Sequence, residues 1–244
     1  MRLLLPPSET KLKGGQPQTG LPTLSFSVQD PGRRDLMAAL ESWCRDSPEV
    51  AAKALKLGPK SIEELGNNVF VDSPVMPAID RYTGVLYSGT GVADWTDLQR
   101  TWAASHLYIH SALFGIVSSA DQIPVYRLSH DTKVNKVALK DYWLGQVTAA
   151  IREMAAGDWI LDCRSEGYRT LAPIPGDVPS AYLEVVSANG GKALNHFNKI
   201  HKGELVRALV TDGPDLPTTD ALVEWGTARG LAMTASGETV TLAI

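Results

Sequence analysis

The segment Lys192–Arg207 combines cationic and amide side chains at helical spacing. In a helix, six of these side chains share one face or lie directly beside it: Lys192, Asn195, His196, Asn198, Lys199 and Lys202. The segment holds four basic residues against Glu204 alone, so it carries +3 on a chain whose net charge is −4. A cationic, amide-bearing stripe on an acidic protein predicts a local binding site for an anion.

The other face of this helix is apolar and is predicted to pack against the body of the protein. It contains Leu194, Phe197, Leu205 and Leu209. His201 lies among them and is predicted to be a packed histidine. His196 instead faces the lysines, whose positive charge should disfavour its protonation. A neutral imidazole at this position could accept a proton during catalysis.

A second candidate site follows the first apolar strand, where Pro6-Pro7 ends the run Arg2–Leu5. Ser8 and Thr10 supply hydroxyl groups and Lys11 supplies an ammonium group, which together are the donors that an oxyanion needs. The glycine and lysine spacing of a P-loop is absent. The alternative is a solvated polar turn between a strand and a loop.

Arg127 lies between apolar neighbours in a predicted strand. A buried guanidinium is costly unless it is paired, so Arg127 is expected to meet a carboxylate or an anionic ligand. Three lysines follow at helical spacing and could form a solvated face: Lys133, Lys136 and Lys140. Tyr82 begins a predicted aromatic strand that ends at Gly89, and its side chain could line a cleft or pack in the core.

Polar side chains also follow the apolar strand Trp159–Cys163. In α/β proteins, such clusters at the carboxyl ends of strands often belong to functional sites. Glu166 and Tyr168 are candidates for proton transfer, and Arg164 is a candidate for substrate binding. The alternative is an ion pair of Arg164 with Asp162 or Glu166 that closes a turn, and both interpretations stay open.

No metal or cofactor site is expected from the sequence. His106 and His110 have the spacing of helical metal ligands, but their segment is better predicted as a strand and lacks a third ligand nearby. The two cysteines, Cys44 and Cys163, cannot form a four-ligand zinc site and indicate reduced thiols in the cytoplasm. A nucleophile elbow and a dinucleotide glycine fingerprint are absent. No run of about 18 apolar residues predicts a membrane span.

The elements that must position these residues are predicted to alternate between strands and helices. Strands are predicted at 2–5, 24–28, 107–109, 112–117, 159–163 and 183–186, helices at 35–45, 48–57, 61–65 and 220–229, and a hairpin at 231–244. The 244 residues, 44% of them hydrophobic, suffice for a sizeable core. We therefore predict a mixed α/β (α+β) fold in one domain over residues 1–244, which could include a small helical subregion over 35–68.

Four separated stretches resemble the YaaA family of bacterial proteins, in its actinobacterial branch, and occur in the order seen there. They are LLPPSETK, RYTGVLY, HLYIHSALFGIVSSADQIPVYRLS and HFNKIHKG, and the resemblance covers most of residues 1–210. It implies an unusual α/β fold with a positively charged cleft and a helix–hairpin–helix-like element, which residues 56–65 would match. By position it implies site residues in each stretch: Ser8, Thr10, Lys11, Tyr82, Gly84, Tyr126, Arg127, His196, Asn198, Lys199 and Lys202.

The resemblance implies two functions of different classes. The best-known family member is a cytoplasmic peroxide-stress protein that binds DNA. Related proteins act in actinobacterial natural-product pathways, where an aziridine-forming enzyme expels sulfate from a sulfated amino acid on an acidic carrier protein. A sulfotransferase would then be a further partner.

The charge distribution favours the enzyme. Non-specific DNA binding depends on many phosphate contacts along a basic surface. Here two basic patches, residues 127–140 and 192–207, each carry +3 and are flanked by acidic stretches, which suits a small anionic substrate better. The candidate substrate-binding residues are Ser8, Thr10, Lys11, Tyr82, Arg127, Arg164, Tyr168, Asn198 and Lys202, and the candidate catalytic residues are Glu166, His196 and Lys199. The lysines and Arg127 would stabilise a departing sulfate or phosphate, while Glu166 or His196 takes a proton from an amine nucleophile, with no cofactor.

Overall fold

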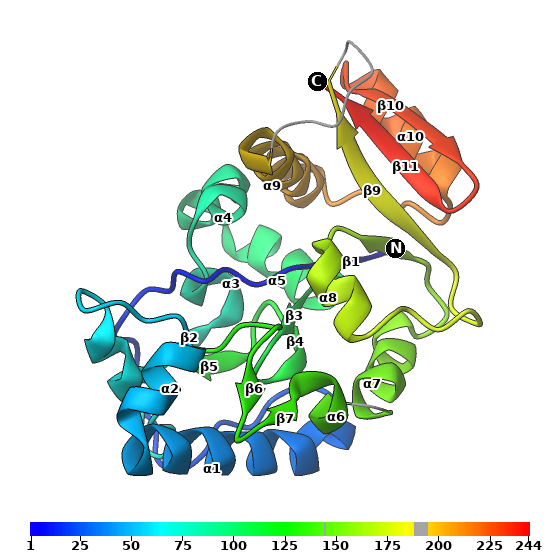
Figure 1. The fold of residues 1–244 in the computed structure, drawn as a ribbon. Coiled ribbons are helices and arrows are strands. Elements are labelled where there is room, and N and C mark those ends of the chain that lie inside the picture. The colour runs from blue at the N-terminus through cyan, green and yellow to red at the C-terminus, as the bar shows by residue number, and fades with distance from the viewer. Residues whose placement is uncertain (144, 188–194) are drawn as a thin grey trace.

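A seven-stranded sheet runs through the molecule in the computed structural model, which describes residues 1–143, 145–187 and 195–244 (Figure 1). Its strands, in spatial order, are β10 (Ala232–Ser236), β11 (Thr239–Ala243), β9 (Ser180–Val186), β8 (Ile160–Asp162), β1 (Arg2–Leu5), β3 (Leu107–Ser111) and β4 (Gly115–Ser118). The five strands from β11 to β3 are parallel, and the edge strands β10 and β4 pair antiparallel. The predicted mixed α/β class is confirmed.

The central strands are apolar runs because layers of the fold bury them on both sides. Leu3, Leu4 and Leu5 in β1 are fully buried, and every residue of β3 and β8 is buried. In contrast, β9 alternates between buried and partly exposed residues. One face of β9 therefore stays open, and its residue Tyr182 becomes important below.

Helices occupy most of the remaining chain. They are α1 (Asp30–Asp46), α2 (Pro48–Ala54), α3 (Ala78–Arg81), α4 (Val85–Thr90), α5 (Asp97–His106), α6 (Leu139–Trp143), α7 (Gln146–Ala155), α8 (Glu166–Leu171), α9 (Asn195–Asp212) and α10 (Thr219–Ala228), with 3-10 turns at Ser27–Gln29, Ile62–Asn67 and Val92–Asp94. Two short ladders pair β2 (Val75–Pro77) with β5 (Gln122–Pro124) and β6 (Lys133–Val134) with β7 (Val137–Ala138). In the described part of the chain, no helix is long and apolar enough to cross a membrane.

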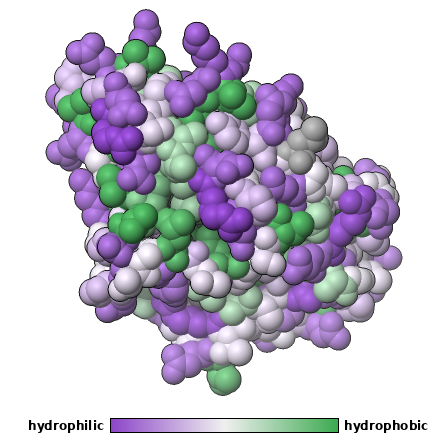
Figure 2. Space-filling view, turned by 90° about the horizontal axis from the view of Figure 1, so that it is seen from below, coloured by the Kyte–Doolittle hydropathy of each residue, from purple (hydrophilic) through white to green (hydrophobic). Residues whose placement is uncertain are grey.

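Helix α1 lies along the lower edge of the molecule in Figure 1 and covers the core from that side. Leu36, Leu40 and Trp43 recur at helical spacing and are buried, as the sequence predicts. Seen from below, this face of the protein is mixed, with hydrophilic residues separating the hydrophobic ones into small groups (Figure 2). Such a surface is ordinary for a water-exposed helix face.

Several predicted elements are wrong, each for a local backbone reason. Residues 24–28 form no strand, because Phe26 adopts a left-handed conformation (φ 61°) and a 3-10 turn follows. The predicted strand from Tyr82 is instead α4, which begins after Gly84 (φ 103°). Asn135 and Lys136 both have positive φ, as in the two-residue turn of a hairpin, so the nearby lysines do not share a helix face.

The helical subregion 35–68 is only partly as predicted. Helices α1 and α2 form, but the segment after Gly58-Pro59 is the 3-10 turn Ile62–Asn67 instead of an α-helix. The expected helix–hairpin–helix-like element is therefore incomplete. Arg127 lies in the loop after β5 and not in a strand.

Candidate functional site

The strand order creates a crevice between β1 and β8. After β1 the chain adds β3 on one side, and it later adds β8, β9 and β11 on the other side. In open parallel sheets, ligands bind at such a switch point, outside the carboxyl ends of the two neighbouring strands. Here those ends lead into Pro6 and Cys163, because Leu4 pairs with Asp162 in register.

A pocket of about 280 Å³ opens at this point and is called the switch-point pocket below. Its lining comes from α4, α8, β9 and α9 and from the residues that follow β1 and β8: Pro6, Leu86, Cys163, Ser165, Glu166, Tyr182, Asn198, Lys199 and Lys202. Four of the residues predicted for the site, Glu166, Asn198, Lys199 and Lys202, therefore meet here. They come from segments more than 30 positions apart in the sequence, as Glu166 and Asn198 illustrate.

Lys202 is the most unusual residue of the pocket. Only 3% of it is exposed, yet among the described residues its Nζ donates one hydrogen bond, to the carbonyl oxygen of Cys163 at 3.1 Å. The ammonium also lies 4.8 Å from the centre of the Tyr182 ring. In the described residues no carboxylate comes within 4 Å of it, and burial lowers its pKa. The sequence predicted Lys202 on a cationic face but not its burial.

Two glycines bring Lys202 and Lys199 to the pocket. Helices α9 and α4 cross at Gly203 and Gly89, and a Cβ at Gly203 would lie 2.1 Å from the carbonyl oxygen of Leu86. Because neither glycine has a side chain, the two backbones touch. This contact fixes how far α9 reaches over the carboxyl end of β8.

Glu166 and Lys199 are exposed, and Asn198 is half-buried. Neither Glu166 nor Lys199 forms an ion pair with another described residue. A carboxylate that can accept a proton therefore faces the same pocket as two ammonium groups. This combination can bind an anionic group and carry out acid–base chemistry beside it.

The rest of α9 differs from the predicted face pattern. His196 is exposed, does not line the switch-point pocket, and lies beside the ring of Phe197, which is itself 50% exposed. Leu205 and Leu209 are buried as predicted. His201 is not packed in the core: its Nδ1 lies 2.7 Å from a carboxylate oxygen of Glu204. Lys192 and Leu194 lie outside the described residues.

A second group of predicted residues gathers around Lys11, which is half-buried. Its Nζ donates to the carbonyl oxygens of Ser8 at 2.9 Å and Glu9 at 3.3 Å, and it lies 4.1 Å from the centre of the Tyr126 ring. Burial lowers the pKa of Lys11 from 10.5 to about 7. Tyr82 is hydrogen-bonded to the Tyr126 hydroxyl at 2.8 Å, so it is a core residue and not part of an open cleft wall.

The hydroxyl groups of Ser8 and Thr10 lie 3.2 Å apart and close against Gly84. A Cβ at Gly84 would lie 2.9 Å from the Ser8 Oγ, so the positive φ and the contact both require glycine. Arg127 was predicted to meet either a carboxylate or an anionic ligand, and it meets carboxylates. Its Nη1 lies 3.3 Å from Glu9 and 3.6 Å from Glu64.

Arg164 forms an ion pair with Asp162, which is one of the two interpretations that the sequence allows. It is fully buried and binds the Asp162 carboxylate with its Nε at 2.9 Å and its Nη2 at 2.8 Å. Its Nη1 donates to His110 Nδ1 at 3.0 Å, so neutral His110 carries its proton on Nε2. Tyr168 packs against the rings of His110 and His130, and burial raises its pKa well above 10.

Sequence reasoning missed Tyr182 and Arg169, which both lie next to this ion pair. Tyr182 lies beside Asp162 in register, and Arg169 stacks on the Tyr182 ring. The alternating pattern of β9 is the one sequence signal for Tyr182. Arg169 lies three positions after Glu166, a spacing that is common between residues on an exposed helix face and therefore does not indicate a site. In the described residues no group of three histidine, cysteine or carboxylate side chains could hold a metal.

Comparisons with known proteins identify relatives along the whole chain. A family model described as peroxide stress protein YaaA matches residues 1–236. A UPF0246 protein of Corynebacterium efficiens is 36% identical over 256 residues and covers 100% of both chains. A UPF0246 protein of Corynebacterium glutamicum is 32% identical, again over 100% of both chains. One of Streptomyces coelicolor is 33% identical over 87% of this chain and 84% of its own.

Proposed function

The chain belongs to the YaaA family, and from this premise we propose that it is an enzyme whose switch-point pocket binds the anionic group of a small substrate. The observation that carries the proposal is Lys202. An ammonium group has three N–H donors, and Lys202 uses one on the carbonyl oxygen of Cys163. A buried charge without a counter-ion is unfavourable, and an anion in the pocket would supply both the missing charge and the missing acceptors.

The proposed reaction is an intramolecular displacement. An amine nitrogen of the substrate attacks the carbon that carries a sulfate ester, the C–N bond forms, and the C–O bond breaks. Sulfate leaves with the electron pair, held by Lys199 and Lys202, and Glu166 takes the proton lost from nitrogen. Alignment and leaving-group stabilisation suffice, so the reaction requires no cofactor.

This chemistry corresponds to aziridine formation in actinobacterial secondary metabolism. The substrate would be a sulfated amine, presented free or on an acidic carrier protein, and a partner sulfotransferase would supply the sulfate ester. His196 is the weaker candidate for the base, because it is exposed and lies outside the lining of the pocket. A cytoplasmic location fits two buried free thiols.

The alternative is a cytoplasmic DNA-binding protein of the peroxide response. Several basic side chains near the incomplete helix–hairpin–helix-like element are already matched by acids. Lys13 pairs with Glu63, Lys56 with Asp131, and Arg127 with Glu9 and Glu64. Each pair lowers the local positive charge that phosphate binding requires, which favours the enzyme over the DNA-binding protein.

Sulfate binding and sulfate release test the proposal. We expect sodium sulfate to raise the melting temperature more than sodium chloride at equal ionic strength, because it binds only the folded protein. Sulfate also stabilises folded proteins in general, so Lys202→Met should reduce this difference to that general effect. Arg152→Gln, which removes an exposed cation paired with Asp177, is the matched control and should preserve the full difference.

Turnover is measured as free sulfate released from 2-aminoethyl hydrogen sulfate, with Glu166→Gln expected to reduce it. Unchanged sulfate binding by Lys202→Met would refute the proposed site. Duplex DNA binding that persists at about 200 mM salt, with no sulfate release, would favour the alternative function.

A further inference from the structure

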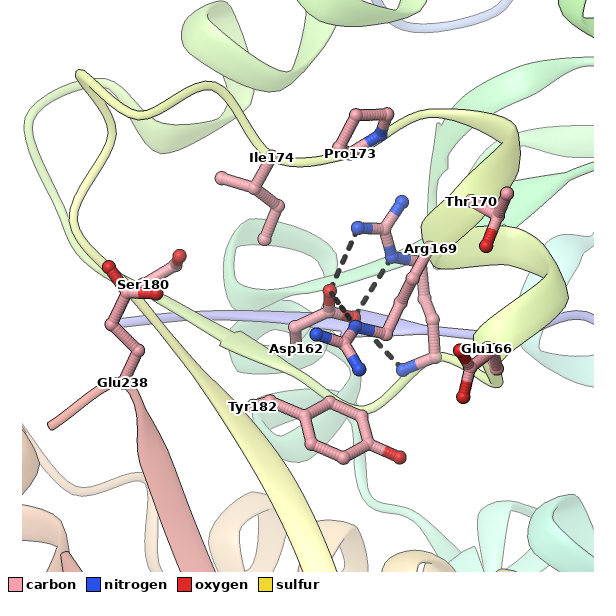
Figure 3. A pocket seen from close by; sticks show the side chains of 10 residues that line it. Asp162, Glu166, Arg169, Thr170, Pro173, Ile174, Ser180, Tyr182 and Glu238 are labelled. Atoms are coloured by element: carbon pink, nitrogen blue, oxygen red, sulfur yellow. Dashed lines mark hydrogen bonds and ion pairs between the residues drawn. The ribbon is translucent and has the colours of Figure 1, made fainter. Parts of the chain in front are cut away.

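The guanidinium group of Arg169 lies between a carboxylate and an aromatic ring (Figure 3). Its Cζ is 4.0 Å from the centre of the Tyr182 ring, and its Nε is 3.8 Å from the nearer oxygen of Asp162. The stacking fixes the plane of the guanidinium group, while the N–H donors along its edge remain accessible to a ligand. The side chain is 42% exposed, so solvent and solutes can reach it.

The charge of Asp162 is already matched by another residue. Arg164 donates to this carboxylate through its backbone nitrogen, its Nε and its Nη2, all within 3.0 Å. Asp162, Arg164 and Arg169 together therefore carry a net charge of +1, and Arg169 is the member that reaches solvent. Its guanidinium makes no hydrogen bond to any residue in the described part of the chain, so its five N–H donors are available.

Arg169 lines hollows that share lining residues with the switch-point pocket. It lines two of them, of about 330 Å³ and 410 Å³, and all three share Glu166 and Tyr182 as lining residues. Tyr182 therefore borders all three hollows, which are together called the trough below. Lys202 Nζ and Arg169 Cζ lie 4.8 Å and 4.0 Å from the centre of this ring, so the two cations are at most 8.8 Å apart.

We propose that Arg169 is a second anion-binding position, which binds a carboxylate of the same substrate through two parallel hydrogen bonds. The inference rests on the proposed function, because it takes the first anionic group to be bound by Lys202. The substrate is then a dianion whose charges are separated by a short chain of about two to four carbon atoms. A carboxylate is the planar partner that a guanidinium fork fits best.

The carboxylates of the trough explain why the second group must be tethered to the first. Glu166 and Glu238 lie on opposite sides of Arg169 (Figure 3), and Glu184 lines the larger hollow. They offset the positive charge of Arg169, so a free anion gains little there. A carboxylate held nearby by its own anionic partner at Lys202 binds at a high effective concentration.

The test compares methanesulfonate with 3-sulfopropionate by isothermal titration calorimetry at constant ionic strength. The first probe has one anionic group and the second has two. We expect 3-sulfopropionate to bind at least about tenfold more tightly, since charge-assisted bidentate hydrogen bonds are strong. Arg169→Gln should remove this advantage and leave methanesulfonate binding unchanged. Arg169→Lys should keep only part of it, and Arg152→Gln should keep all of it.

Each result has a distinct meaning. If the unmodified protein binds both probes equally, the inference about Arg169 is overturned while the proposed function stands. If Arg169→Gln weakened the binding of both probes equally, the inference would also be overturned, because Arg169 would then only support the fold. If the unmodified protein binds neither probe, the proposed function itself fails.

Discussion

Replacing Gly203 by alanine is expected to destabilise the protein and to weaken sulfate binding together. Helix α9 touches α4 through this glycine, and an added Cβ would lie 2.1 Å from the Leu86 carbonyl oxygen and 2.9 Å from the Gly89 Cα. Both are backbone atoms, which cannot rotate away as a side chain does. The two helices must therefore separate, and Lys202, the neighbour of Gly203, moves with α9.

The magnitude follows from two opposing terms. Overpacking a tight contact costs about 1–3 kcal/mol, and a clash with backbone belongs at the upper end of that range. Alanine regains about 1 kcal/mol from its better helix propensity. The net expectation is a loss of about 1–2 kcal/mol in the free energy of unfolding, with a lower sulfate affinity because the Lys202 hydrogen bond to Cys163 is strained.

Urea unfolding followed by circular dichroism measures the stability, and calorimetry measures the sulfate affinity. Gly66→Ala is the matched control, because a Cβ at Gly66 meets nothing within 4 Å. It should leave binding unchanged and alter stability by less than about 1 kcal/mol. A Gly203→Ala protein as stable as the unmodified one, with normal sulfate affinity, would refute the close-contact explanation.

Three further predictions concern buried groups. Lys11 has a pKa of 10.5 in the unfolded chain and of about 7 in the folded protein, so unfolding takes up a proton between these pH values. The free energy of unfolding should therefore rise with pH from 7 to 10.5. Urea unfolding at several pH values should show that Lys11→Met loses this rise. Burial raises the pKa of both Cys44 and Cys163, so neither thiol should react with Ellman's reagent or peroxide until denaturant is added. Asp162→Ala should cost about 3–5 kcal/mol in urea unfolding by leaving Arg164 buried without its counter-ion, and Asp162→Leu combined with Arg164→Met should cost less. A double variant as unstable as Asp162→Ala would show that hydrogen bonding, and not the uncompensated charge, dominates.

The sequence predicted best where one pattern dominates a whole element. The apolar runs at 2–5 and 159–163 are β1 and β8, and the C-terminal hairpin forms at 232–243 as expected. Residues Glu166, Asn198, Lys199 and Lys202 were recognised from residue type, and the sheet topology brings them together. Local pattern and tertiary structure agree at these positions.

The sequence failed where contacts between distant segments decide the outcome. Periodicity places Phe197 on the buried face and Lys202 beside the cationic face, but in the structure α9 crosses α4 at its glycine so that Lys202 is buried and Phe197 is exposed. The partners of Arg127 come from positions 9 and 64, which no spacing rule connects. The turn at Asn135-Lys136 needs two positive φ angles; asparagine favours the first, but lysine does not favour the second, so residue type did not predict the turn.

The position of β1 has a consequence for the order of events on the ribosome. β1 is synthesised before every other strand of the sheet, yet it is an interior strand that lies between β3 and β8. One edge of β1 therefore stays without its partner until residue 162 has emerged, and Lys202 reaches Cys163 only later still. Nascent chains that stop before β8 expose a long-lived apolar strand edge, so we expect them to aggregate or to recruit chaperones.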